Sequence, residues 1–110
     1  MASGVYPQAY SRLSCALVAN VSSTAPKTIN CLDTEVRGIL VFLGRASQRI
    51  GMYLIVMLKD AERICIPVLS ASQISADTTQ SNKITLTSSS TSNAVGYLLL
   101  FSDPDNVSIT

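Results

Sequence analysis

The stretch GILVFLGRASQRIGMYLIVMLKD, residues 38–60, decides the fold of this chain. Two strongly apolar runs, 36–44 and 50–58, flank a polar insert that contains Arg45 and Arg49. Each run has nine residues, whereas a helix that spans a membrane needs ~20 apolar residues. The two arginines between the runs would also be costly inside a bilayer. We therefore expect a soluble protein without membrane insertion, in which this stretch forms a β-hairpin.

Apolar and polar residues alternate with a period of two along most of the chain, a pattern typical of β-strands. Besides the hairpin, we expect strands at residues 12–22, 28–32, 62–69, 82–88 and 94–102. We interpret residues 70–81 as a polar connection in which Ile74 alone packs inward, and residues 103–110 as either an extra edge strand or a loose end. The pattern predicts an all-β fold, a small antiparallel β-sandwich or jelly roll of about seven or eight strands.

The chain has 110 residues, enough for one domain with its own core. We expect residues 1–11 to form an N-terminal arm or a segment derived from a shaft, and residues 12–110 to form the β-sandwich domain. Charged residues make up 14% of the chain and the net charge is +1, which gives no electrostatic footprint for nucleic acid. Ser and Thr together number 25, so the polar surface suits neutral partners such as carbohydrate or another subunit.

Catalytic signatures are absent from the sequence. It contains no His, so it has neither a Ser-His nor a Cys-His pair. Its three cysteines, Cys15, Cys31 and Cys65, lack the C-x-x-C spacing of metal and redox sites. We interpret them as small buried hydrophobes made in a reducing compartment. The sequence predicts a protein that is not an enzyme and that uses no cofactor and no metal.

The strands of the hairpin are apolar on both faces, whereas a sandwich strand normally has one polar face. Only one of the two faces can fill the space between the sheets, and the other would form a patch larger than soluble monomers usually expose. The polar loop and the termini, identical subunits or a different chain could cover it. We favour identical subunits arranged as a homotrimer. The candidates for the subunit-contact face are Tyr53, Ile55, Met57, Leu98 and Leu100.

The turn of residues 44–49 concentrates polar recognition groups at the tip of the hairpin. Arginine and glutamine side chains can bind hydroxyls or carboxylates in a planar arrangement. The hydroxyl-rich loop that precedes the last strong strand offers similar groups. The candidates for receptor binding or subunit contact are Arg45, Gln48, Arg49, Ser89 and Asn93.

Residues of about 10 to 110 resemble the small C-terminal head, or tip, domains of bacteriophage tail fibres and receptor-binding proteins. The likeness lies in the doubly apolar strands, the hydroxyl-rich turns and the closing hairpin KITLTSSSTSNAVGYLLLFS, residues 83–102. The resemblance implies a non-enzymatic homotrimer that docks onto a bacterial surface glycan or protein. It also implies a protein made in the host cytoplasm and located in the virion at the tail tip.

Two further interpretations stay open. A structural virion protein, such as a decoration or capsid-associated jelly roll, would share the assembly argument and need no ligand. A cellular lectin-like or cytokine-like jelly roll would also fit the strand pattern.

Overall fold

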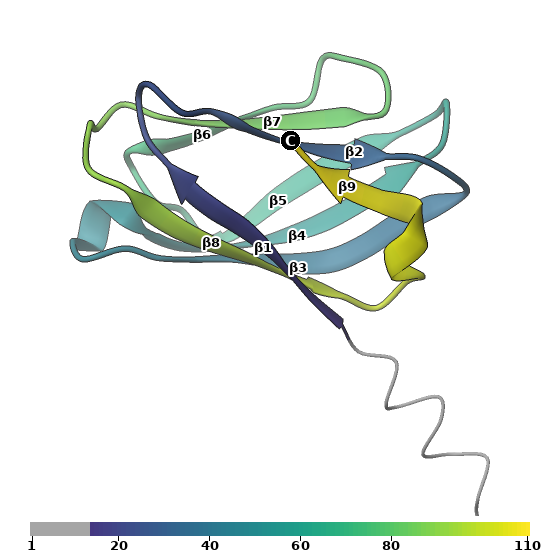
Figure 1. Ribbon diagram of the computed structural model, residues 1–110, viewed down its shortest axis with the longest axis horizontal. Coiled ribbons are helices and arrows are strands. Elements are labelled where there is room, and N and C mark those ends of the chain that lie inside the picture. The colour runs from purple at the N-terminus through teal and green to yellow at the C-terminus, as the bar shows by residue number, and fades with distance from the viewer. Residues whose placement is uncertain (1–13) are drawn as a thin grey trace, which may run out of the picture.

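The alternation of apolar residues produces β-strands along most of the chain. A computed structural model describes residues 14–110, and these form nine strands, two 3-10 turns and no α-helix (Figure 1). The strands are β1 (Ser14–Val21), β2 (Lys27–Cys31), β3 (Glu35–Leu43), β4 (Ile50–Leu58), β5 (Arg63–Leu69), β6 (Ile74–Asp77), β7 (Lys83–Ser88), β8 (Ala94–Leu100) and β9 (Val107–Ile109). The 3-10 turns are η1 (Ser47–Arg49) and η2 (Pro104–Asn106).

The strands form two antiparallel sheets that pack face to face, which confirms the predicted β-sandwich. One sheet has five strands in the order β1-β8-β3-β4-β5, and the other has four in the order β6-β7-β2-β9. The pairs β1–β8 and β2–β7 are nested, as in a jelly roll, and β3, β4 and β5 follow one another as a meander.

Two segments form strands that could not be assigned from the alternation of apolar and polar residues. The connection at 70–81 contains β6, which pairs with β7 from Ile74 opposite Ser88 to Asp77 opposite Thr85. The tail forms β9, an edge strand beside β2, so the edge-strand alternative is the correct one. Both strands are short. Pairing with the neighbouring strand determines their conformation more than their own sequence does. The arm predicted at residues 1–11 lies outside the described residues.

The core lies between the two sheets, and it contains all five residues proposed for the subunit-contact face. That assignment was wrong: Tyr53 is 7% exposed, and Ile55, Met57, Leu98 and Leu100 are at most 1% exposed. A period of two shows which residues share a face but not which face is inside. The polar atom of Tyr53 tolerates burial because its Oη accepts a hydrogen bond of 2.8 Å from the backbone N of Ala71.

A bulge interrupts the alternation in β1. Leu17 lies opposite Tyr97 and Ala19 lies opposite Gly96, so β1 has one extra residue, Val18. Ala19 has a positive φ of 67°. Because of the bulge, Val18 and Val21 are both fully buried although they are three positions apart.

The packing of β3 against β8 predicts that Gly38→Ala destabilises the fold. A Cβ at Gly38 would lie 2.5 Å from the backbone O of Leu99, which cannot move without shifting β8. Overpacking of this kind costs about 1–3 kcal/mol, measurable as a lower urea midpoint. Thr87→Ala on an exposed position is the control, with an expected change within about 0.5 kcal/mol. Equal midpoints for the two variants would contradict the pairing of β3 with β8.

Candidate functional site

The two ends of the sandwich carry different loops. We call the end formed by loops 22–26, 44–49, 70–73 and 89–93 the pocket end, and it lies on the left in Figure 1. The opposite end is formed by loops 32–34, 59–62, 78–82 and 101–106, and we call it the closed end. All the polar residues predicted as binding candidates lie at the pocket end.

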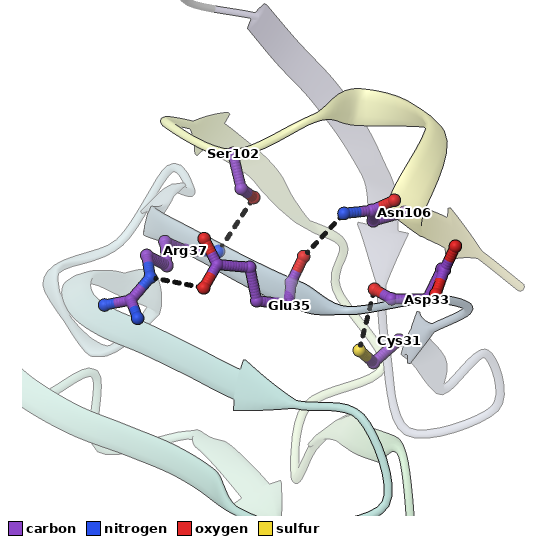
Figure 2. A network of polar contacts seen from close by, with 6 residues as sticks. All are labelled: Cys31, Asp33, Glu35, Arg37, Ser102 and Asn106. Carbon is purple, nitrogen blue, oxygen red and sulfur yellow. Dashed lines mark hydrogen bonds and ion pairs between the residues drawn. The ribbon is translucent and has the colours of Figure 1, made fainter.

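Side-chain to backbone bonds hold the loops of the closed end together. Figure 2 shows Ser102 Oγ accepting from the backbone N of Arg37 at 2.9 Å, and Asn106 Nδ2 donating to the backbone O of Glu35 at 3.2 Å. At the same end, Asn82 Oδ1 accepts from the backbone N of Asp60 at 2.7 Å, and Asn82 Nδ2 donates to Asp60 Oδ1 at 2.9 Å. These bonds tie the loops of the closed end to one another and to the start of β3.

The pocket end contains a depression of about 540 Å³. Its walls come from three separate segments that the fold brings together: the end of β1, the β3–β4 loop and the β7–β8 loop with the start of β8. Its lining residues are Asn20, Leu43, Gly44, Arg45, Arg49, Thr91, Ser92, Asn93 and Val95. Two arginines therefore line one depression together with amide and hydroxyl residues, and no Asp or Glu is among the lining residues.

Neutral groups hold the Arg49 side chain in place. Its Nη1 donates to Gln73 Oε1 at 2.9 Å and to Ser90 Oγ at 3.4 Å. Its Nε is buried and has no hydrogen-bond partner. The ion pair found in the described part of the chain, between Arg37 Nε and Glu35 Oε1 at 3.0 Å, involves neither arginine of the depression. The positive charge of Arg49 is thus not balanced by a nearby carboxylate.

Three of the five predicted binding candidates, Arg45, Arg49 and Asn93, meet in the depression. Gln48 and Ser89 do not line it, and their backbone groups instead fix Gln73. The N of Gln73 donates to the O of Gln48 at 3.0 Å, and the N of Ser89 donates to the O of Gln73 at 2.9 Å. Gln73 and Asn20 could not be predicted as site residues, because nothing in their local sequence shows that the fold places them beside the hairpin tip.

The outer face of the five-stranded sheet is the second surface of interest. It is apolar on every strand, and its cross-strand pairs include Ile39 with Leu54, Val41 with Tyr97, and Leu54 with Ile66. We define the apolar face as Cys15, Leu17, Ile39, Val41, Leu43, Met52, Leu54, Val56, Ile64, Ile66, Tyr97 and Leu99. Leu54 is 42% exposed, Ile66 52% and Leu17 60%. A hairpin with two apolar faces is therefore present, but its exposed face is the opposite of the predicted one.

The outer face of the four-stranded sheet is polar instead. The hydroxyls of Thr28 and Thr85 lie 3.3 Å apart, and Asn30 Nδ2 donates to the O of Ser108 at 3.2 Å. Lys83 and Thr87 on β7 are exposed. This face is the ordinary solvent face of a sandwich, and the contrast between the two faces marks the apolar face as unusual.

Residues 14–110 also contain no candidate metal-binding group, no membrane-spanning helix and no disulfide bond. No three His, Cys, Asp or Glu side chains of this region are grouped so that they could bind a metal ion. No helix within it is long and apolar enough to cross a membrane. The three cysteines are unpaired, with Cys31 buried, Cys65 half-buried and Cys15 exposed on the apolar face. Cys15 thus departs from the expectation of three buried thiols.

Burial of Cys31 predicts a loss of stability at alkaline pH. Desolvation of the thiol raises the pKa of Cys31, so its thiolate forms more readily in the unfolded chain. The stabilising contribution is complete below the ordinary thiol pKa of about 8.5 and is lost as the pH rises through the folded value. We expect the urea midpoint to fall between pH 7 and pH 10, and to fall less in Cys31→Ala. The same pH dependence in both proteins would contradict this account.

No family model matches the sequence, and no matching curated protein or solved structure was found. The apolar face and the depression at the pocket end are therefore the two features of the molecule that bear on its function.

Proposed function

We propose that the protein is a non-enzymatic viral adhesin that acts as a homotrimeric tip domain and binds a glycan or protein on the bacterial surface. The observation that carries the proposal is the apolar face, which extends over all five strands of one sheet. The hydroxyl and amide groups of the pocket end supply the recognition surface, and the virion is the proposed location.

The size and chemistry of the apolar face support assembly. Covering about 600 Å² per subunit would contribute about 15 kcal/mol at roughly 25 cal/mol per Å². This value exceeds or matches most estimates of the cost of association, about 4–15 kcal/mol. Glu35 and Arg37, the charged residues at the margin of the face, pair with each other, so the face offers no net charge to an oppositely charged partner.

Identical copies fit this face better than a chemically different chain. A cyclic assembly buries the same patch in every copy, so no subunit keeps an open apolar face. In a trimer, each five-stranded sheet can contact one neighbour near β1 and the other near β5, the two edges of the sheet. The shallow apolar hollow lined by Cys15, Val41, Leu43, Tyr97 and Leu99 provides a place for a neighbour's side chains.

The direction of the chain also suits a tip domain. Ser14, at the start of β1, pairs with Leu100 near the closed end. The depression lies at the other end of β1, beside Asn20. A carrier on the side of the closed end would therefore leave the pocket end pointing away from the carrier and toward a receptor.

Binding to bacterial polysaccharides tests the adhesin proposal. Labelled protein should bind an array of bacterial surface polysaccharides or intact bacterial cells. Leu54→Glu puts a charge in the middle of the apolar face and should reduce binding at least ~10-fold, because avidity requires several linked sites. Thr87→Glu, on the polar outer face, is the matched control and should bind like the wild type.

Failure of the wild type to bind any array spot or cell, while it stays assembled, would contradict the adhesin proposal. That result would favour a structural virion protein, which needs the apolar face but no receptor. Equal binding by Leu54→Glu and the wild type would contradict a role for assembly in attachment.

A further inference from the structure

Arg49 brings a positive charge to the depression at the pocket end, and no carboxylate of residues 14–110 pairs with it. Arg49 is half-buried, its hydrogen-bond partners are the neutral groups of Gln73 and Ser90, and its buried Nε has no acceptor. Buried donors in proteins nearly always have a partner. An oxyanion bound in the depression would balance the positive charge of this guanidinium, although it would not reach the buried Nε.

Arg45 adds a second positive charge to the depression. Arg45 lies in the same depression, is exposed, and forms no ion pair within the described residues. An anion bound in the depression would interact favourably with both positive charges. Planar guanidinium groups bind carboxylates through paired N–H donors. The electrostatics of the depression therefore favour a carboxylate or a similar oxyanion.

The rest of the lining favours a ligand larger than a bare anion. The depression has a volume of about 540 Å³, within the range of about 300–1,000 Å³ for pockets that hold small molecules. Asn20, Thr91 and Asn93 offer amides and a hydroxyl that can pair with ligand hydroxyls. Leu43 and Val95 offer apolar surface for the C–H face of a sugar ring.

Arg49 is also held in place before any ligand binds. The Oε1 of Gln73 accepts a hydrogen bond from the Arg49 guanidinium. Backbone hydrogen bonds from two neighbouring loops fix Gln73 in turn. The N of Gln73 donates to the O of Gln48 at 3.0 Å, and the O of Gln73 accepts from the N of Ser89 at 2.9 Å. A side chain fixed in this way loses little conformational entropy on binding.

We propose that this depression binds an acidic saccharide, with its carboxylate held by Arg49 and Arg45 and its hydroxyls by the amides and hydroxyls of the walls. The inference rests on the proposed function, since it names the class of receptor glycan that the tip would recognise. Neutral sugars would leave both guanidinium groups without an anion and should bind poorly.

Direct titration of the full chain tests the proposal. The probes are N-acetylneuraminic acid, glucuronic acid, glucose and inorganic phosphate, followed by calorimetry or amide chemical shifts. At least one of the two acidic sugars should bind ~10-fold or more tightly than glucose and phosphate. Arg45→Gln and Arg49→Gln should each weaken its binding ~10-fold or more, and Lys83→Gln, which removes the same charge from the distant end of β7, should not.

Several results would overturn the proposal. Equal affinities of the acidic sugars and phosphate would indicate an unspecific anion site, and equal affinities of the acidic sugars and glucose would exclude a role for the carboxylate. Loss of binding in Lys83→Gln would indicate general charge attraction. If Arg49→Gln fails to fold, Arg45→Gln still decides, because the Arg45 side chain is exposed and no hydrogen bond or ion pair with residues 14–110 holds it.

The same titrations separate this inference from the adhesin proposal. Binding to bacterial polysaccharides without affinity for either acidic sugar would place the receptor site elsewhere and leave the adhesin function standing. Affinity for an acidic sugar in a protein that binds no polysaccharide or cell would support the pocket and contradict the adhesin function. A change of oligomeric mass in Arg45→Gln would assign the arginines to subunit contact and overturn the inference.

Discussion

A β-strand presents its side chains to two faces, and the central strands β3, β4 and β8 carry apolar side chains on both. The sandwich can bury only one of these faces between its sheets. The inner face carries the core residues around Leu40, Ile55 and Leu98, which are at most 1% exposed. The outer face is left to solvent or to other subunits. The stability of the fold and the proposed assembly both depend on how the chain resolves this conflict.

The same hairpin links the apolar face to the depression. Its two strands form the middle of the five-stranded sheet, and its tip supplies Arg45 and Arg49 to the pocket end. Leu43 lines both the depression and the apolar hollow, so the two surfaces adjoin. In an assembled trimer, each arginine pair would therefore lie near a subunit boundary, at the end away from Ser14.

Much of the fold could be predicted from the sequence because the alternation of apolar residues is a local property. The strands at residues 36–43, 50–58 and 94–100 follow from it directly. It could not assign the inner face, because glycines and the Tyr53 hydroxyl make the inner face look less apolar than the outer one. Gly38, Gly51 and Gly96 all lie on the inner side, where they let β3, β4 and β8 pack closely.

The candidate site could be predicted only in part, for a similar reason. The arginines of the hairpin tip stand out in an apolar stretch, and a loop rich in hydroxyls suggests contact with a ligand. The partner of Arg49 is Gln73, a residue 24 positions away in a segment that looked like a plain connection. Such a contact depends on how β6 pairs with β7, which residue patterns do not encode.

The central claim is that copies of this chain cover the apolar face. The most direct test is the mass of the wild-type protein in solution, measured by light scattering at micromolar concentration. A subunit has a mass of 11.7 kDa, so the account predicts a species of three times 11.7, about 35 kDa. A stable species of 11.7 kDa at these concentrations would contradict it.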